Sequence, residues 1–395
     1  MMKTTKNTKE LYITEIPSDW VVKKLGEISV IKTGDKDTQN KVEDGLYPFF
    51  VRSDNVERIN SFSYDGEAIL TSGDGVGVGN NFHYIIGKFD FHQRVYSIRK
   101  FNSETFGKFI YYYFSEKFYE RVIKLSAKNS VDSVRMEMIF DMKIPLPPLP
   151  EQIAIAQVLS TADAAIHTSE KLIAQKELRK KWLMQQLLTG KKRLKGFEGE
   201  WKEHSYEKIL KVVKRNFDWD ENELYKLISV RRRSGGIFYR EALYGHQILV
   251  KTLRTANEGD FLFSKMQILH GASALVTKEF DGAKISGSYI AVVPKDKKQL
   301  NMEFFQWYSQ TPYFYHQTYI SSYGVHIEKM TFDFDTFLQL EMKLPSIEEQ
   351  TAIAQVLQAA DKEISLLKAK AEKLMEQKKG LMQQLLTGKV RLRIN

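Results

Sequence analysis

Hydrophobic residues recur with a helical spacing in two long segments of the chain. In residues 353–385 they follow alternating steps of three and four, a 3.5-residue repeat with Lys378 as its polar interruption. The apolar positions are Ile353, Leu357, Ala360, Ile364, Leu367, Ala371, Leu374, Leu381 and Leu385. This spacing is typical of a coiled-coil seam. The alternative is a long amphipathic helix that packs on its own domain.

The same segment occurs twice at a fixed distance. The sequence QIAIAQVL at 152–159 returns as QTAIAQVL at 350–357, and LMQQLLTGK at 183–191 returns at 381–389, both 198 residues later. The first copy keeps the seam but admits polar residues at Ser169, Lys176 and Lys180. Prolines precede each helix, and Gly190 and Gly388 suit the C-terminal caps. Because an apolar seam needs a partner, we expect the two copies to pair as an antiparallel coiled coil.

Each helix follows a globular region. The first region begins at Trp20, and a related start occurs at Trp201, 181 residues later. The two globular regions differ in length, whereas the two helices do not. The predicted boundaries are a flexible tail over 1–15, a first domain over 16–150, a first spacer helix over 151–195, a second domain over 196–348 and a second spacer helix over 349–395.

Short strands mixed with helices indicate an α+β fold for both domains. Apolar alternation predicts strands over 91–98 and 288–293, and helices dense in Phe and Tyr are predicted over 104–125 and 301–310. An apolar strand is expected to close each domain, containing Phe140, Met142, Ile144 and Leu146 in the first and Leu338, Leu340, Met342 and Leu344 in the second. The aromatic residues recur at helical spacing, so we interpret them as core rather than as a platform for stacked bases.

Composition narrows the class of protein. A chain of 395 residues with 43% apolar residues suits two folded domains. The absence of cysteine excludes a disulfide scaffold and a thiolate zinc site, and it fits the reducing cytoplasm. No apolar run is long enough to span a bilayer, and residues 1–9 lack the apolar core of a secretory signal. The net charge of +10 favours a polyanionic partner, with nucleic acid ahead of an anionic membrane surface.

Basic and amide side chains set among apolar residues are the candidate DNA contacts. Arg231, Arg232 and Arg233 precede Ser-Gly-Gly at a predicted strand-to-loop junction, where guanidinium groups can reach phosphates or guanine edges. A solvated basic loop is the alternative. The other candidates are Gln93 and Arg94 in the first domain and Lys265, Gln267, His326 and Lys329 in the second. An ordinary solvated strand face is the alternative for each of these.

The sequence contains no complete catalytic motif of the kinds considered below. The glycine-rich stretch Gly73–Gly79 lacks the GK[ST] ending of a phosphate loop, so a flexible turn is the preferred interpretation. Asp333 or Asp335 with Glu341 and Lys343 faintly resembles a nuclease pattern, but the pattern is absent from the first copy of this segment. Neither an H-E-x-x-H motif nor an Asn-Pro-Pro-Tyr-type methyltransferase motif occurs. We therefore expect no catalytic residue and no metal ligand in this chain.

The whole arrangement resembles the specificity (S) subunit of a Type I restriction-modification system. The resemblance rests on Trp20 followed by LGEI at 25–28, on the proline segment 144–152 with its copy at 342–350, and on two helices that end in MQQLLTGK. It covers essentially the whole chain. The second copy departs from the pattern at Ser346 and Glu348, and the second lead-in lacks Leu-Gly-Glu.

This resemblance implies two target recognition domains, each reading one half of a split double-stranded DNA site. Because the two domains differ in sequence, the site is expected to be asymmetric. The helices would set the spacer and help dock two modification (methyltransferase) subunits. Those partners would bind S-adenosylmethionine and methylate adenine, and restriction subunits would use ATP and Mg. The chain itself would bind no cofactor and catalyse nothing. The alternatives are a coiled-coil scaffold that binds other proteins and, more remotely, an enzyme.

Overall fold

The computed structural model describes residues 16–75, 77–126, 133–249, 251–324, 326 and 330–393. It divides into two compact units, one formed by residues 1–170 with 369–395 and the other by residues 171–368. Each unit holds one globular head and one half of each long helix. The predicted tail over 1–15 lies outside the described residues. Within the described part, the helices are too short or too polar to cross a membrane.

The head of the first unit, residues 16–148, is built on a six-stranded sheet. The strands of this head are β1 (Val21–Lys24), β2 (Val30–Thr33), β3 (Tyr47–Phe50), β4 (Val56–Ile59), β5 (Tyr64–Ser72), β6 (Phe82–Phe91), β7 (Val95–Arg99) and β8 (Lys143–Leu146), of which β2 to β7 form the sheet. Its helical segments are α1 (Leu25–Ile28), η1 (Thr38–Asn40), α2 (Gly107–Leu125) and α3 (Met136–Phe140). The sheet has the order β2-β7-β5-β6-β3-β4, and β1 pairs separately with β8. The central strand β5 runs antiparallel to both neighbours.

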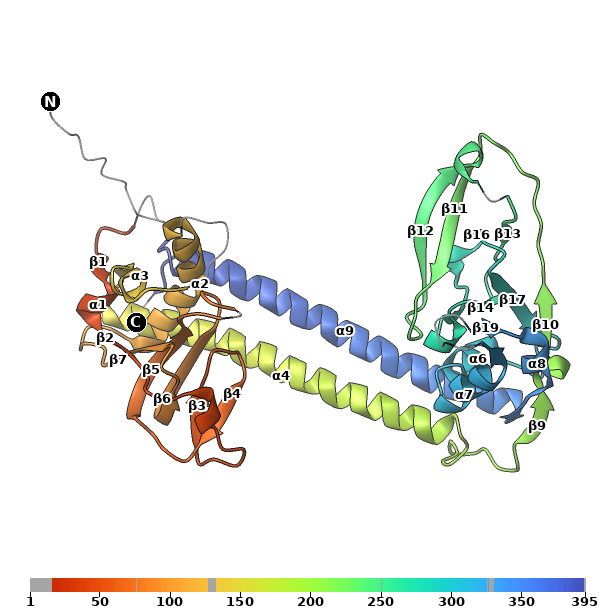
Figure 1. Ribbon diagram of the computed structural model, residues 1–395, viewed down its shortest axis with the longest axis horizontal. Coiled ribbons are helices and arrows are strands. Elements are labelled where there is room, and N and C mark those ends of the chain that lie inside the picture. The colour runs from red at the N-terminus through yellow and green to blue at the C-terminus, as the bar shows by residue number, and fades with distance from the viewer. Residues whose placement is uncertain are drawn as a thin grey trace. The chain divides into compact units, whose positions relative to one another are not determined.

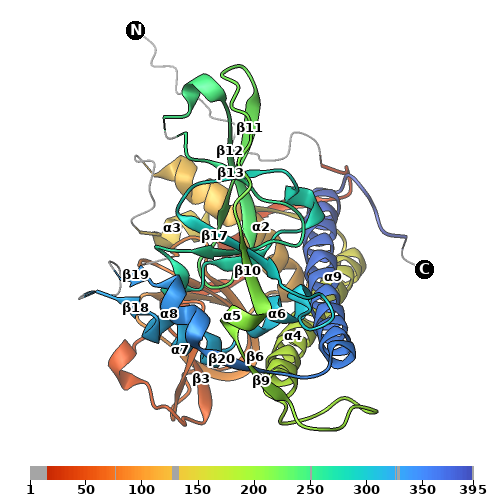
Figure 2. The same ribbon diagram turned by 90° about the vertical axis from the view of Figure 1, so that its right-hand side faces the viewer.

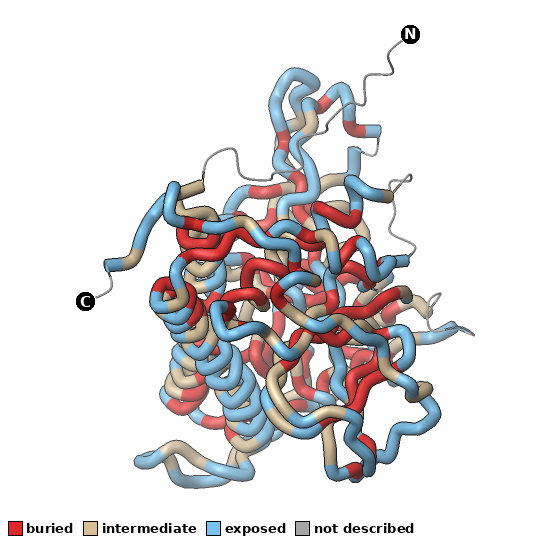
Figure 3. Tube along the Cα trace, turned by 90° about the vertical axis from the view of Figure 1, so that its left-hand side faces the viewer, coloured by how far each residue is buried: buried red, intermediate tan, exposed pale blue. Residues whose placement is uncertain are grey.

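The aromatic side chains of α2 form the core of this head. Phe109, Phe114 and Phe118 are fully buried, and the last two rings stack with their centroids 4.3 Å apart. Each such side chain stabilises the fold by about 1.5–3 kcal/mol through its burial. Figure 3 shows the buried segments gathered inside the head and exposed residues along its outer surface. The aromatics are therefore core, as the helical spacing indicated.

The head of the second unit, residues 188–346, contains more and shorter strands. They are β9 (Lys202–Ser205), β10 (Leu210–Val213), β11 (Leu224–Val230), β12 (Ile237–Tyr244), β13 (Arg254–Thr255), β14 (Phe261–Ser264), β15 (Ser273–Leu275), β16 (Lys284–Ile285), β17 (Tyr289–Pro294), β18 (Ser322–Tyr323), β19 (Thr331–Phe332) and β20 (Glu341–Leu344). The helical segments are α5 (Tyr206–Ile209), η2 (Gly245–Gln247), η3 (Ile268–His270), η4 (Lys278–Phe280), α6 (Met302–Tyr308), α7 (Pro312–Ile320) and α8 (Phe334–Gln339).

The two heads share one antiparallel sheet topology. The order β10-β17-β14-β15 in the second head repeats β2-β7-β5-β6 in the first, strand for strand. Likewise β9 pairs with β20 as β1 pairs with β8. The heads differ in what is added: β3 and β4 extend the first sheet, whereas the second head has a separate sheet of order β12-β11-β16-β13. Figure 2 shows β11 and β12 as a long hairpin that extends from this head.

The long helices α4 (Leu149–Leu187) and α9 (Ile347–Leu385) are each 39 residues long. They run antiparallel, since Lys176 pairs with Glu363 at 2.5 Å, and Lys180, further along α4, pairs with Asp361, which comes earlier in α9 (Figure 1). Every described seam position of both helices is buried or half-buried, which confirms the predicted coiled coil. Each ends before a glycine in the left-handed conformation, Gly190 (φ 69°) and Gly388 (φ 70°), as a C-terminal cap requires.

The lysines on the seam form ion pairs with acidic residues of the other helix. Lys378 forms an ion pair with Asp163 at 2.5 Å, and its repeat counterpart Lys180 pairs with Asp361. Ser169 instead donates to the carbonyl oxygen of Ala165 in its own helix at 2.8 Å. These partners remove most of the penalty of placing lysine on an apolar seam. The same pairing occurs in both units, so it belongs to the repeat.

Repeated glutamines join each long helix to its head. Gln152 accepts a hydrogen bond from the Phe106 N–H at 2.9 Å and donates to the Pro147 carbonyl at 2.9 Å. Gln350 accepts from the Asn301 N–H at 2.9 Å and donates to the Pro345 carbonyl at 3.0 Å. These contacts fix the first turn of each helix against its head and account for the identity of the two glutamines.

Three secondary-structure predictions need correction. The strand expected over 91–98 is two strands, because β6 ends at Phe91 and a turn closed by the Val95 N–H and the His92 carbonyl (2.9 Å) precedes β7. The closing strands begin later than expected, since Phe140 lies in α3 and Leu338 in α8. The helix expected over 301–310 covers only α6. A second helix, α7, follows it with Thr311 as its N-cap.

Candidate nucleic-acid interface

One edge of the shared sheet has the same backbone connections in both heads. After β5, the N–H of Gly73 donates to the Arg94 carbonyl at 2.7 Å, and the Val134 N–H donates to the Gly73 carbonyl at 2.7 Å. After β14, the N–H of Lys265 donates to the Ser288 carbonyl at 2.9 Å, and the Phe332 N–H donates to the Lys265 carbonyl at 3.3 Å. We call this edge, where β5 or β14 ends, the reading edge.

The backbone of the reading edge is shared, but its side chains are not. Gly73 in the first head corresponds to Lys265 in the second, and Arg94 corresponds to Ser288. Most of the candidate residues lie at this edge, although the sequence alone does not show which strands pair. The two heads therefore carry different side chains at equivalent positions of the same backbone.

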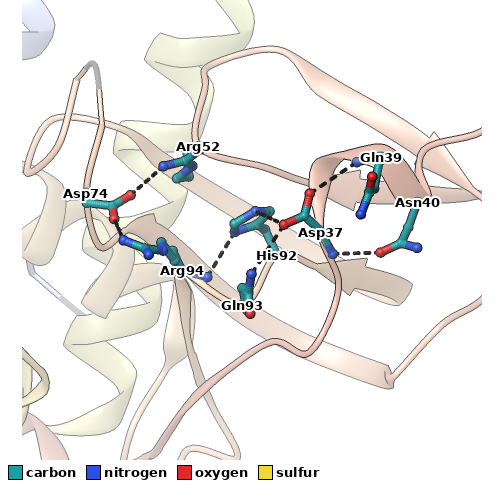
Figure 4. A network of polar contacts seen from close by, with 8 residues as sticks. All are labelled: Asp37, Gln39, Asn40, Arg52, Asp74, His92, Gln93 and Arg94. Atoms are coloured by element: carbon teal, nitrogen blue, oxygen red, sulfur yellow. Dashed lines mark hydrogen bonds and ion pairs between the residues drawn. The ribbon is translucent and has the colours of Figure 1, made fainter.

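In the first head, Gln93 and Arg94 occupy the turn between β6 and β7 and are both exposed. Arg94 donates from Nη1 to Oδ2 of Asp74, and Arg52 donates from Nη1 to Oδ1 of the same carboxylate at 3.0 Å. Figure 4 shows the two guanidinium groups approaching Asp74 from different sides. Burial raises the pKa of Asp74, but the hydrogen bonds from Arg94 and Arg52 outweigh it, so this pKa lies below its ordinary value. Asp74 is therefore ionised at neutral pH.

Gln93 belongs to a second set of contacts around Asp37. Its Nε2 donates to Oδ2 of Asp37 at 3.3 Å, and Nε2 of His92 lies 3.8 Å from the same oxygen (Figure 4). Nδ1 of His92 accepts a hydrogen bond from the Arg94 N–H at 2.9 Å, so the proton of the neutral ring sits on Nε2. Burial first, and then the charge of Arg52, lowers the pKa of His92. The neutral imidazole thus holds the turn that presents Gln93 and Arg94.

In the second head, Arg231, Arg232 and Arg233 form the exposed turn between β11 and β12. The guanidinium carbon of Arg231 lies 4.4 Å from the centroid of the Phe238 ring, a cation–π contact. Arg233 and Ser234 both have positive φ, 57° and 53°. Such non-glycine conformations persist where the surroundings hold them. Here the N–H groups of Arg233 and Ser234 donate to the carbonyls of His270 and Gly271 at 2.5 and 2.9 Å.

Those two hydrogen bonds bring the arginine turn to the reading edge. His270 and Gly271 belong to the turn between β14 and β15, which also contains Gln267. Lys265 and Gln267 are half-buried there, so only part of each side chain faces solvent. His326 is exposed in the segment between β18 and β19, and β19 contacts Lys265 through Phe332. The last candidate, Lys329, lies outside the described residues.

Sequence reasoning missed Arg52 and Asp74. Arg52 follows β3 and Asp74 follows β5, so only the folding of the sheet brings either residue to Arg94. Asp74 left one signal, since it is the only charged residue in the stretch Gly73–Gly79. Asp333, from the rejected nuclease pattern, caps α8 by accepting from the N–H groups of Asp335 and Thr336. In the described part of the chain, the acidic and histidine residues form no group suited to a metal ion.

Comparison with known proteins identifies the family of this chain. The family model of the Type I restriction modification DNA specificity domain matches the chain twice, over residues 17–177 and 209–376. The chain is 25% identical over 437 residues to the Type I restriction enzyme MjaVIII specificity subunit of Methanocaldococcus jannaschii, which covers 98% of this chain and 96% of that protein. It is 29% identical over 161 residues to the Type I restriction enzyme EcoDI specificity subunit of Escherichia coli, which covers 41% of this chain and 35% of that protein.

A solved structure shares the fold. The crystal structure of the S subunit of a Type I restriction-modification system from M. genitalium superposes with a TM-score of 0.63 and 14% identity, covering 100% of this chain and 99% of that one. The two family matches together span more than half of the chain, and each contains most of one head. The chain therefore belongs to the Type I restriction-modification DNA specificity family, and its role is the recognition of DNA.

Proposed function

We propose that the two heads bind two different half-sites of one asymmetric, bipartite double-stranded DNA sequence through their reading edges. The observation that carries the proposal is the pair of equivalent backbone positions, Gly73 and Lys265, with unlike neighbours Arg94 and Ser288. Because base edges are recognised by side chains, a shared backbone with different side chains selects different sequences. The net charge of +10 favours association with the phosphate backbone.

Selection from a random duplex library tests this function. The full-length chain, assembled with its modification subunits, should enrich two unlike short sequences separated by a spacer of fixed length. Binding should weaken steeply with salt, because each phosphate contact releases condensed counterions. Enrichment of a palindromic site, or of none, would contradict the proposal.

The long helices carry identical exposed residues that packing does not explain. Gln157, Gln185 and Lys191 are exposed on or just after α4, and their counterparts Gln355, Gln383 and Lys389 are exposed on or just after α9. Buried repeats follow from the seam, whereas solvated identical side chains need another reason. We infer that each copy docks one modification (methyltransferase) subunit, giving two per chain, and that restriction subunits join this assembly in the cytoplasm.

Mass measurement of the assembled complex tests the docking. Replacing Gln185 with Glu should weaken one of the two sites and replacing Gln383 with Glu the other, leaving one modification subunit per chain in each case. The double variant should lose both. Replacement of Gln157 or Gln355 gives an independent pair for the same comparison. If all variants keep two subunits, these glutamines do not form the docking surface.

The chain on its own is proposed to have no catalytic activity. S-adenosylmethionine, ATP and Mg would be bound by the partner subunits, since the sequence offers neither a phosphate loop nor a methyltransferase motif. Incubation of the purified chain with DNA and labelled S-adenosylmethionine should transfer no methyl groups. Addition of the modification subunits should restore the transfer to adenine. Transfer by the chain alone would contradict this part of the proposal.

A further inference from the structure

A carboxylate lies between two arginines at the reading edge of the first head (Figure 4). Arg52 and Arg94 donate to different oxygens of Asp74. The Asp74 side chain is 18% exposed, whereas those of Arg52 and Arg94 are 42% and 61% exposed. The carboxylate is therefore the deeper member of the group, and the two guanidinium groups are presented to solvent from one anchor.

The backbone fixes where these side chains begin. Ser72 at the end of β5 pairs with Val95 at the start of β7, and the Gly73 N–H donates to the Arg94 carbonyl at 2.7 Å. The backbone of Asp74 also forms an isolated antiparallel β-bridge with Ser133. Asp74 and Arg94 thus each lie within two residues of the strand pair Ser72–Val95. A guanidinium group held in this way loses less conformational freedom when it binds a ligand.

Binding of DNA phosphates by Arg52 and Arg94 would not require a carboxylate at Asp74. Two arginines would offer two positive charges to the DNA backbone, but the ionised carboxylate reduces the net charge of the group to one and repels phosphates. Base recognition needs an oriented guanidinium fork instead, because arginine binds guanine through two hydrogen bonds, to O6 and N7. Asp74 engages Nη1 of Arg94, and within the described residues no hydrogen bond reaches its Nε or Nη2.

We propose that Arg94 reads a guanine in the half-site bound by the first head, and that Asp74 is the positioning residue that orients Arg94 with support from Arg52. This inference rests on the proposed DNA recognition by the reading edge. In the second head Ser288 stands in the place of Arg94, so the other half-site is read there by different side chains.

The base read by Arg94 can be found by selection and then tested chemically. The assembled complex carrying Arg94→Ala should lose the preference for one guanine in one half-site only. Arg94→Lys, which keeps the charge but not the fork, should lose the same preference. In the parent, 7-deazaguanine at this position should weaken binding about tenfold or more, because it lacks N7. Inosine, which keeps O6 and N7, should not.

The role of Asp74 is tested with Asp74→Asn, which keeps the size of the side chain and removes its charge. Discrimination for that guanine should fall about fivefold, since a charge-assisted hydrogen bond is replaced by a weaker one, while affinity for unrelated DNA should hold or rise. Asp141→Asn is the matched control. Asp141 pairs with Lys24 at 2.8 Å beside β1 and β8, which form a sheet separate from the one that carries the reading edge. This control should leave the preference unchanged.

The outcomes distinguish failure of the proposed function from failure of this inference. If the parent selects no bipartite site, the proposed function fails and this inference fails with it. If a site is selected but 7-deazaguanine has no effect at any guanine of the first half-site, Arg94 does not read guanine. If Asp74→Asn raises affinity for all sequences alike and leaves discrimination intact, Asp74 only repels DNA and does not position Arg94.

Discussion

Arg193 donates two hydrogen bonds to the carboxylate of Glu349, from Nε to Oε1 at 2.6 Å and from Nη2 to Oε2 at 2.5 Å. Arg193 lies just after α4, and Glu349 lies in the first turn of α9. The repeat makes the same contact, since Arg391 donates to the two oxygens of Glu151 at 2.6 and 2.7 Å. An arginine six residues beyond the end of each long helix thus binds the first turn of the other helix.

Replacing Arg193 with alanine should destabilise the second unit by about 3 kcal/mol, because it leaves the buried Glu349 carboxylate without its partner. The Glu349 side chain is only 1% exposed, so solvent cannot replace the guanidinium group. Chemical denaturation of the full chain measures the change. The control is Lys191→Ala, an exposed residue of the same segment, which should stay within about 0.5 kcal/mol of the parent.

A second change identifies the cause of that destabilisation. Adding Glu349→Gln to Arg193→Ala should recover part of the stability, because a neutral amide is less costly to bury than an unpaired carboxylate. Equal stability of the single and double variants would show that the destabilisation came from the other contacts of Arg193. These are its packing over Trp201, whose ring centroid lies 6.0 Å from the guanidinium carbon, and its hydrogen bonds to the carbonyls of Glu198 and Gly199.

The lysines of the seam should set pairing rather than provide much stability. Lys180→Glu places like charges opposite Asp361 and should lower the free energy of unfolding by about 1 kcal/mol. Adding Asp361→Lys should recover most of that stability, and a double-mutant cycle gives the coupling. Lys378 and Asp163 allow the same cycle in the first unit. Zero coupling at both places would mean that the seam tolerates lysine without these acids.

The first head should lose stability in mild acid through His92. Burial, followed by the charge of Arg52, lowers the folded-state pKa of His92 below its ordinary value of about 6.5. The contribution of neutral His92 to the stability of the fold is complete above about pH 6.5, and it is lost as the pH falls through the lower pKa of the folded state. The melting temperature of the parent should therefore drop more between pH 7.5 and 5.5 than that of His92→Gln. Parallel pH profiles would contradict the assignment.

The sequence predicted best what depends on regular spacing. The seam of α4 and α9 followed from residues such as Leu159 and Leu357, which recur at a fixed interval and are fully buried. The ion pairs that accommodate Lys180 and Lys378 could not be foreseen, because the helix register decides which acid lies opposite. Alternation likewise suggested one strand over 91–98, whereas local hydrogen bonding makes a turn at His92.

The candidate site was predicted only in part. Exposed arginines such as Arg231 can be recognised in a sequence because they have nowhere to be buried. The equivalence of Gly73 and Lys265 depends on which strands pair, and the residues around them share no sequence motif. Asp74 was missed for the same reason, since its partners Arg52 and Arg94 are 22 and 20 residues away. Strand pairing between distant segments thus assembles the candidate site, and the sequence alone does not show which strands pair.

The arginine turn of the second head should contribute to DNA affinity. Replacing Arg231, Arg232 and Arg233 together with alanine should flatten the dependence of log K on log salt by about one unit for each phosphate that the variant no longer binds. An arginine that reads a base should instead cost about 1–3 kcal/mol on the cognate half-site only. The matched control replaces Lys295, Lys297 and Lys298, which are exposed beyond the opposite end of β17. Binding equal to that of the parent at every salt concentration would remove the turn from the interface.

Lengthening both long helices should change the preferred DNA spacer. One heptad added after Glu170 and one after Lys368 preserve the 3.5-residue seam and add about 10.5 Å at about 1.5 Å per residue. Because DNA rises about 3.4 Å per base pair, the optimum spacer should grow by about three base pairs. Three base pairs also rotate the DNA by roughly 100°, whereas the coiled coil turns by only about 25° over that length. Affinity should therefore fall even on the best new site unless the heads turn at the proline and Thr-Gly junctions. Measuring the variant against half-sites at every spacing decides the matter, because an unchanged optimum would mean that α4 and α9 do not set the spacer.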